Sequence, residues 1–196
     1  MRGMRQRRHG DNWTVIFLVI LAISIAFGFV FDFVCDRVEQ NKYPKTEVYR
    51  KAVAHASEEF GVPENLIWAV IKVESDFDSS AESDSGEVGL MKISVEIFDE
   101  ITDRKLMDGF DPGMRYDPST NIRYGAYHLS YLFAKYGNWN TAIVAYDVGE
   151  AQVDAWLSDP QYGNAETGVL VKIPGKEARR YQTDVNDVLE KYDRIY

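Results

Sequence analysis

The sequence predicts a mainly α domain that follows a single N-terminal transmembrane helix. Three observations support this: residues 13–31 are apolar and uncharged, apolar residues recur at helical spacing through most of residues 46–196, and alternating strand patterns are scarce. Of the 196 residues, 45% are hydrophobic and 27% are charged, which is typical of a folded protein rather than of a disordered or low-complexity chain.

The charge balance and the few metal-binding side chains exclude several functions. Lys and Arg number 22 against 31 Asp and Glu, and the net charge of -9 argues against nucleic acid as a partner. A single cysteine, Cys35, excludes an intramolecular disulfide framework. With only three scattered histidines besides it, little is left for a zinc site, so we expect no metal.

The N-terminal segment has the pattern of a membrane anchor. Residues 1–12 form a basic tail with four Arg and one Asp, and residues 13–31 then carry no charge. At about 1.5 Å per residue this run reaches roughly 28 Å, close to the thickness of a bilayer's hydrocarbon core. The positive-inside rule places the basic tail in the cytoplasm and the rest of the chain outside.

A cleaved signal peptide is the alternative, but the apolar run is long for one and no clean cleavage site follows it. We therefore predict a single-pass protein of the cell membrane with an uncleaved signal anchor. Residues 32–45 would form a stalk, and residues 46–196 one folded domain.

Capping residues divide this domain into helices. Glycines end two of them, prolines open two, and a serine caps a short one. We expect helices at residues 48–60, 63–75, 94–101, 118–136, 140–146, 153–157 and 179–192, and a short strand at residues 169–171.

Glu74 stands out because it continues an apolar helix face. Ile67, Val70 and Ile71 share that face by i, i+3 and i+4 spacing, and Glu74 follows at the carboxyl end of the helix. Burial and the negative end of the helix both disfavour an ionised carboxylate, so both raise its pKa. A carboxyl that is protonated near neutral pH suits a general acid. Spacing alone would equally fit a solvated glutamate at a helix end.

Five motifs, in order over about residues 48–192, resemble the soluble-lytic-transglycosylase (SLT) family. The family patterns E-S-x-F, A-x-S-x-x-G-x-x-G-L-M-Q, N-I-x-x-G-x-x-Y-L, A-Y-N-A-G and I-P-x-x-E-T-R-x-Y align with residues 74–77, 81–92, 121–129, 145–149 and 173–181 of this sequence. The residues that match them are Glu74, Ser75, Phe77, Ala81, Ser83, Gly86, Gly89, Leu90, Met91, Asn121, Ile122, Gly125, Leu129, Ala145, Tyr146, Gly149, Ile173, Pro174, Glu177, Arg179 and Tyr181, whereas Ala178 stands where the family has threonine. The resemblance implies a lysozyme-like α fold and peptidoglycan glycan strands as substrate. It also implies cleavage of the β-1,4 bond between N-acetylmuramic acid and N-acetylglucosamine, without a metal or cofactor.

Glu74 matches the family's single catalytic glutamate. That residue protonates the glycosidic oxygen and then deprotonates the muramyl 6-hydroxyl, which attacks C1 and leaves a 1,6-anhydro sugar. One carboxyl group suffices because the substrate supplies its own nucleophile, whereas ordinary glycosidases use two.

The resemblance also assigns substrate-binding positions. Ser83 and Tyr146 match residues near the catalytic carboxyl, Met91 matches a residue that lines the sugar cleft, and Glu177 and Tyr181 match positions close to that cleft.

Two family amides are replaced by charges of opposite sign: Lys92 stands where the family has glutamine, and Asp147 where it has asparagine. If the two positions face each other, we expect them to form an ion pair and to act in substrate binding. They could instead mark an altered substrate preference or a decayed site.

Two other functions stay open. A hydrolytic muramidase of the goose-type lysozyme kind would need a second acid to hold water, and five acids follow Glu74 closely: Asp76, Asp78, Glu82, Asp84 and Glu87. A non-catalytic cell-wall binding or assembly module would need none of them.

Overall fold

The structure is a computed structural model that describes residues 11–103 and 111–196. Most of the basic tail expected at residues 1–12 lies outside the described residues. The chain divides into two compact units, one that ends at Pro44 and one that comprises Lys45–Arg194 and Tyr196.

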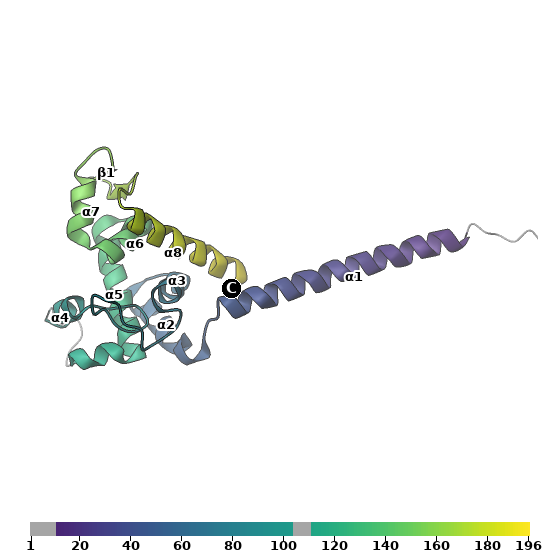
Figure 1. Ribbon diagram of the computed structural model, residues 1–196, viewed down its shortest axis with the longest axis horizontal. Coiled ribbons are helices and arrows are strands. Elements are labelled where there is room, and N and C mark those ends of the chain that lie inside the picture. The colour runs from purple at the N-terminus through teal and green to yellow at the C-terminus, as the bar shows by residue number, and fades with distance from the viewer. Residues whose placement is uncertain (1–10, 104–110) are drawn as a thin grey trace, which may run out of the picture. The chain divides into compact units, whose positions relative to one another are not determined.

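The first unit consists of one long helix, α1 (Asp11–Lys42), coloured purple in Figure 1. Within the described residues it is the one helix long and apolar enough to cross a membrane, with a mean hydropathy of 2.8 and none of its apolar window buried by other parts of the chain. The sequence predicted such a helix. The helix also continues past residue 31 to Lys42, so most of the expected stalk is helical.

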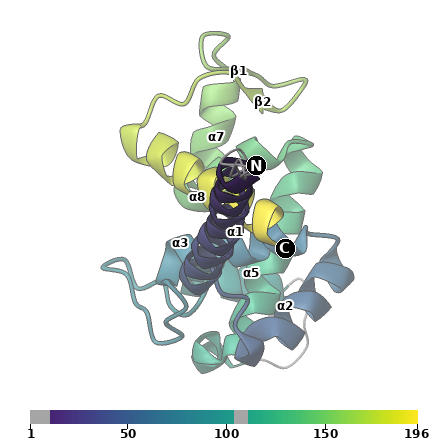
Figure 2. The same ribbon diagram turned by 90° about the vertical axis from the view of Figure 1, so that its right-hand side faces the viewer.

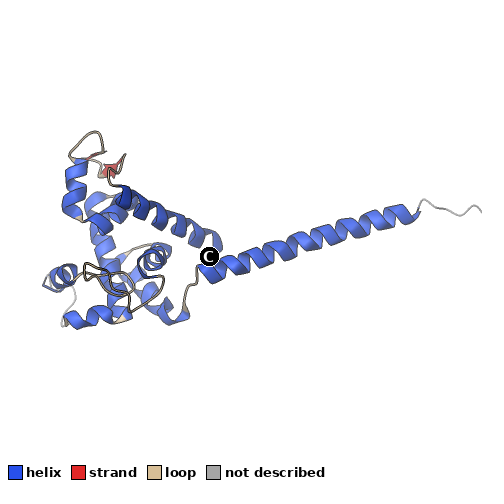
Figure 3. Ribbon diagram, viewed as in Figure 1, coloured by secondary structure: helices blue, strands red, loops and turns tan. Residues whose placement is uncertain are grey.

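The second unit is built almost entirely from helices (Figure 3). Its elements are α2 (Glu47–Phe60), α3 (Glu64–Ser75), α4 (Val95–Asp103), the 3-10 helix η1 (Pro112–Tyr116), α5 (Pro118–Tyr136), α6 (Trp139–Val148), α7 (Glu150–Leu157), β1 (Gly163–Asn164), β2 (Val169–Leu170) and α8 (Lys176–Ile195). Each strand has only two residues. The mainly α prediction is therefore confirmed.

Side-chain caps fix the ends of the longer helices. The Asp117 carboxylate accepts a hydrogen bond from the Thr120 backbone N–H (2.8 Å) at the start of α5, and Asn138 caps α6 in the same way. Gly137 ends α5 with a φ of 66°, a left-handed conformation that glycine adopts without strain. The expected role of Pro63 was wrong by one position: it precedes α3 as the N-cap residue and is not its first helical residue.

The β1–β2 hairpin was expected only in part. Residues 169–171 suggested a strand, but its antiparallel partner β1 was not predicted. Gly168, between the strands, has a φ of +65°, and a Cβ there would lie 2.1 Å from the Tyr136 carbonyl oxygen. The hairpin therefore packs closely against the end of α5, at a distance that only glycine allows.

Helix α5 lies at the centre of the second unit and packs against both α2 and α6. In Figures 1 and 2, α7 and the hairpin lie at one end of this unit and α2 at the other, and α8 runs back from the hairpin toward α3. A hydrogen bond of 2.7 Å from Asn65 of α3 to Asp193 of α8 links these two helices. At the other end of this pair, a hydrogen bond from Tyr181 to Glu74 brings the start of α8 to the carboxyl end of α3.

Candidate active site

Glu74 lies at the carboxyl end of α3, where a buried helix face meets a loop. Ile67, Val70 and Ile71 on that face are completely buried, and the Glu74 side chain is 12% exposed. Directly after the helix, Asp76 and Phe77 both have positive φ values, 50° and 68°. Two successive non-glycine residues in this region turn the chain sharply and store strain beside the carboxylate.

The loop that faces Glu74 is a tight turn between Val88 and Ile93. These two residues exchange backbone hydrogen bonds in both directions, at 3.0 and 3.2 Å. Within the turn, Gly89 has a φ of 84° and Lys92 a φ of 44°. The Ser75 hydroxyl of α3 donates to the Leu90 carbonyl oxygen (2.9 Å), so the turn is tied to the end of the helix.

Asn121 of α5 holds this turn from inside the domain. Its side-chain oxygen accepts from the Met91 N–H (2.7 Å), and its amide nitrogen donates to the carbonyl oxygens of Val88 (2.7 Å) and Arg115 (2.8 Å). The side chain is buried, so these bonds form away from water. The turn therefore has a fixed position relative to α5.

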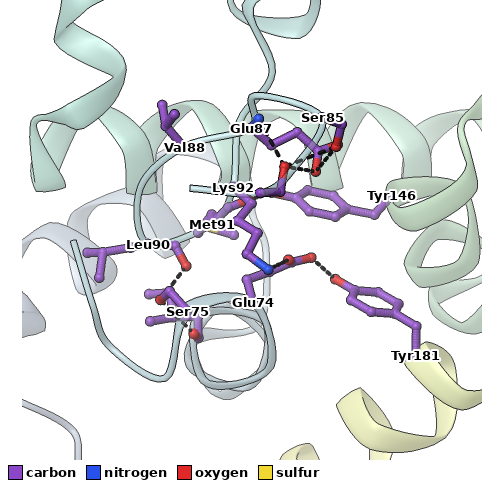
Figure 4. A network of polar contacts seen from close by, with 12 residues as sticks. Glu74, Ser75, Ser85, Glu87, Val88, Leu90, Met91, Lys92, Tyr146 and Tyr181 are labelled. Atoms are coloured by element: carbon purple, nitrogen blue, oxygen red, sulfur yellow. Dashed lines mark hydrogen bonds and ion pairs between the residues drawn. The ribbon is translucent and has the colours of Figure 1, made fainter. Parts of the chain in front are cut away.

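The two oxygens of Glu74 have different partners (Figure 4). The Tyr181 hydroxyl of α8 donates to Oε1 at 2.6 Å. The Lys92 ammonium lies 3.7 Å from Oε2. Three separate segments, α3, the 88–93 turn and α8, thus meet at one carboxyl group.

The pKa of Glu74 is raised from 4.5 to about 7, and burial is the largest cause. The Tyr181 hydrogen bond and the Lys92 charge favour the ionised form and lower the pKa in part, while the charges of Glu87 and Asp147 raise it further. At neutral pH this carboxyl group is therefore close to half protonated, which suits a group that both donates and accepts a proton.

Tyr146 and Met91 support the site from one side. The Tyr146 hydroxyl donates to the Met91 carbonyl oxygen at 2.7 Å, and burial and the Glu74 charge raise the pKa of this phenol. The Met91 side chain is completely buried, and a Cβ on Gly125 of α5 would lie 2.5 Å from its sulfur atom. Met91 therefore packs behind the turn and offers its backbone oxygen to the site.

Ser83 lies in a second group of polar contacts. Its hydroxyl donates to Glu87 Oε2 (3.0 Å), and the Glu87 N–H donates back to the Ser83 hydroxyl (3.1 Å). Ser85 also donates to Glu87 Oε2, at 3.3 Å. The contacts of Ser83 described here are with Glu87 and Ser85, and Glu87 is the residue of this group whose charge acts on Glu74.

Asp147 and Glu177 lie near each other at the edge of the site. Both are exposed, and the pKa of Asp147 is raised by partial burial and then by the charges of Glu87 and Glu177. The ion pair expected between Lys92 and Asp147 is not among those formed by the described residues, because the Lys92 ammonium pairs with Glu74. The two substituted positions thus act on the same carboxyl group with opposite effects on its pKa.

Sequence reasoning placed Glu74 correctly at the end of a buried face, but it missed two contacts. The first is the pairing of Lys92 with Glu74, which depends on the left-handed backbone conformation of Lys92. The second is the hydrogen bond from Ser83 to the Glu87 carboxylate, which depends on the fold of the 82–88 loop. Neither has a periodic signal. The replacement of a family glutamine by Lys92 was the one feature of the sequence that indicated a changed contact at this position.

A pocket lies elsewhere on the domain, away from Glu74. It has a volume of about 570 Å³, lies beside the hairpin and is lined by residues that include Tyr136, Asp154 and Gly168. Lys135 and Tyr136 both bond to Asp154, and these bonds lower the pKa of that carboxyl group against the effect of its burial. Asp154 is therefore not suited to act as an acid near neutral pH.

Known proteins resemble the second unit in sequence and in fold. The sequence profile of the Transglycosylase SLT domain family matches residues 51–167. The soluble lytic murein transglycosylase of Escherichia coli K12 is 29% identical over 137 residues, covering 69% of this chain and 21% of the relative. The membrane-bound lytic murein transglycosylase C of Edwardsiella ictaluri is also 29% identical, covering 75% of this chain and 47% of the relative. The chain thus spans between a fifth and a half of these relatives.

Solved structures agree with the sequence matches. An inactive mutant of the lytic transglycosylase Slt of Pseudomonas aeruginosa superposes with a TM-score of 0.69 at 26% identity, covering 79% of this chain and 25% of that one. The 70 kDa soluble lytic transglycosylase of Escherichia coli gives 0.70 at 25% identity, covering 80% of this chain and 25% of that one. The predicted lysozyme-like fold class is confirmed by these neighbours. The chain belongs to the Transglycosylase SLT domain family.

Proposed function

We propose that this protein is a lytic transglycosylase that cleaves the β-1,4 bond between N-acetylmuramic acid and N-acetylglucosamine in peptidoglycan. Glu74 is the general acid and then the general base, and the products carry 1,6-anhydromuramyl ends. The observation that carries the proposal is the buried carboxyl group at the end of α3, whose pKa of about 7 allows it to hold and to accept a proton near neutral pH.

The contacts of Glu74 give each of its oxygens a role. Because Oε1 accepts the hydrogen bond from Tyr181, the transferable proton resides on Oε2. This proton passes to the glycosidic oxygen as the bond from C1 to that oxygen breaks. The resulting carboxylate is stabilised by the Tyr181 hydroxyl and by the Lys92 ammonium.

The second step regenerates the acid. The carboxylate takes the proton of the muramyl 6-hydroxyl while that oxygen forms its bond to C1, which closes the anhydro ring. Glu74 then holds one proton again, and no water is consumed. This proton balance requires one carboxyl group whose pKa lies near the working pH, as Glu74 has.

Substrate binding falls to residues around Glu74. Tyr181 and Lys92 contact the Glu74 carboxyl group, and Tyr146 binds the Met91 backbone oxygen beside it. The remaining members of the proposed binding set are Ser83, which bonds to Glu87, and the neighbouring acids Asp147 and Glu177. Their hydroxyl, ammonium and carboxylate groups suit the hydroxyl and amide groups of an amino sugar.

Helix α1 would anchor the enzyme, with the N terminus in the cytoplasm and the catalytic domain outside the membrane. The apolar span of α1 and the arginines that precede it in the sequence support this orientation. The enzyme would then act on glycan close to the membrane surface.

The test is release of soluble muropeptides from purified peptidoglycan by the full chain and by a Glu74→Gln variant. Gln keeps the acceptor for Tyr181 but cannot donate an acidic proton, so we expect the rate to fall by about 10²-fold or more. Glu58→Gln, an exposed change on α2, is the matched control and should keep the parent rate. Equal rates for the parent and Glu74→Gln would favour a binding or assembly module instead.

A further inference from the structure

The five acids that follow Glu74 differ in their surroundings. Asp76 pairs with Lys72, and Asp78 accepts hydrogen bonds from Ser80. These two residues are exposed, as are Glu82 and Asp84. Glu87 is the one of the five that is partly buried.

The carboxylate of Glu87 is held in one orientation. Both Ser83 and Ser85 donate to the same oxygen, Oε2, at 3.0 and 3.3 Å. The backbone reinforces this, because the Ser83 N–H donates to the Glu87 carbonyl oxygen at 2.9 Å and the Glu87 N–H donates to the Ser83 hydroxyl. Within residues 11–103 and 111–196, the side-chain hydrogen bonds given for the Glu87 carboxylate go to Oε2, so Oε1 can accept from a further partner.

Glu87 also lies within electrostatic reach of the residues around Glu74. Its negative charge acts on Glu74, on the Tyr146 hydroxyl and on Asp147, and it contributes to the raised pKa of all three groups. In Figure 4 the Glu87 carboxylate lies near the start of the Lys92 side chain, and the Glu74 carboxyl group lies at its ammonium end. The loop and the end of α3 thus present two carboxyl groups to one site.

We propose that Glu87 is a second catalytic carboxylate, which activates a water molecule at the anomeric carbon, so that this protein hydrolyses a share of the bonds that it cleaves. The proposal rests on the assignment of Glu74 as the acid. A hydrolytic glycosidase usually has two catalytic carboxyl groups. One protonates the leaving oxygen, and the other activates water.

In the hydrolytic step, Glu74 gives its proton to the glycosidic oxygen, and the bond from C1 to that oxygen breaks. A water oxygen forms the new bond to C1 and loses one proton to Glu87. Glu87 and Glu74 then return to their starting states by exchanging one proton through solvent. The product is a reducing-end muramic acid, heavier by one water than the anhydro product.

The experiment compares the full chain with Glu87→Gln and Glu82→Gln on purified peptidoglycan. The released muropeptides are reduced at once and their reducing and anhydro ends are counted by mass spectrometry. Glu82→Gln is the matched control, because it makes the same chemical change on an exposed residue of the same loop. The anhydro products of each variant report in the same sample that the fold and Glu74 are intact.

We expect the parent and Glu82→Gln to release both kinds of end. The ratio of reducing to anhydro ends should fall by roughly 10²-fold in Glu87→Gln, the size of effect typical for loss of a general base. The proposal is overturned if the parent releases anhydro ends alone, or if the ratio in Glu87→Gln equals that in Glu82→Gln. Equal loss of both products in Glu87→Gln also overturns it, since Glu87 would then act through Glu74 or through the fold. Failure of the parent to cleave any glycosidic bond would instead refute the proposed function.

Discussion

At the scale of single residues, the carboxyl group of Glu74 is set by opposing influences. Burial raises its pKa strongly, whereas the Tyr181 hydroxyl and the Lys92 ammonium oppose that rise. A buried carboxyl group without such partners would stay protonated and would be a poor base. With these partners the pKa of Glu74 lies near 7, so the same carboxyl group can donate a proton in the first step of the proposed reaction and accept one in the second.

The cation at position 92 should therefore set the upper pH limit of activity. Glu74 must be protonated to act as an acid, so activity falls as the pH rises through its pKa. Lys92→Gln removes a charge that lowers this pKa, and we expect the basic limb of the kcat/KM profile to move up by about 0.5–1 pH unit. Lys72→Gln, which removes a cation that pairs with Asp76, is the control. If the basic limb of the kcat/KM profile stays in place or moves to lower pH in Lys92→Gln, Lys92 does not lower the pKa of a catalytic Glu74.

The same raised pKa has a consequence for stability. Unfolding returns Glu74 from a pKa of about 7 to about 4.5, so the folded state binds its proton more tightly and loses stability as the pH rises between these values. Glu74→Gln removes this penalty. The variant should be more stable than the parent by about 3 kcal/mol at pH 8, and the difference should vanish near pH 4.

Urea unfolding at several pH values measures this difference directly. The Glu58→Gln control should show none of the pH dependence attributed to Glu74. A difference between Glu74→Gln and the parent that is the same at pH 4 and at pH 8 would mean that Glu74 is not perturbed in the folded protein.

At the scale of elements, the 88–93 turn is positioned by α5. Asn121 binds the backbone of the turn on one side, and Gly125, one helical turn later, leaves room for the Met91 side chain. The site thus depends on a close contact between a helix and a loop about 30 residues apart in the sequence.

A side chain at position 125 should push the turn away from α5. In Gly125→Ala the new Cβ would lie 2.5 Å from the Met91 sulfur and 2.8 Å from the Met91 Cβ, and we expect a loss of about 1–3 kcal/mol in the free energy of unfolding. A Met91→Ala background removes the clash, so the same change should cost less there. Equal losses in both backgrounds would show that Met91 is not what Gly125 accommodates.

The elements that the sequence predicted well are those with local signals. Helix α5 has a cap at Asp117 and a terminating glycine at Gly137, and both act within a few residues of the helix. The β1 strand has two residues and no alternation, so its pairing with β2 could not be seen locally. Periodicity similarly located Glu74 on α3, because the apolar face is a property of that helix alone.

The contacts that complete the site around Glu74 have no such local signal in the sequence. The approach of Lys92 and Tyr181 to Glu74 requires the turn held by Asn121 and the return of α8 to α3. These are tertiary relations between distant segments, and the pattern of any one segment does not contain them. The expectation of a Lys92–Asp147 pair failed for this reason, since it considered charge without position.

At the scale of the whole molecule, the proposal joins a membrane anchor to a wall-cleaving domain. Its orientation can be tested at Cys35, which is the one cysteine of the sequence and lies exposed on α1, four residues beyond the apolar run 13–31. If the domain is outside, a membrane-impermeant maleimide should label Cys35 in intact spheroplasts or protoplasts.

The control for this labelling is a Cys35→Ser chain that carries Arg5→Cys, which should react only after the membrane is opened. Labelling of Cys35 that also required permeabilisation would place the domain on the cytoplasmic side. A mature chain that lacks the apolar run would show that a signal peptide had been cleaved.

The proposed enzyme uses Glu74 to cleave peptidoglycan and leaves 1,6-anhydromuramyl ends. The most direct test is a mass spectrum of the muropeptides that the full chain and its Glu74→Gln variant release from purified peptidoglycan. We expect anhydromuramyl ends, one water lighter than hydrolytic ends, from the parent and none from the variant. Anhydromuramyl ends that persist in the variant, or a parent that releases reducing ends alone, would contradict it.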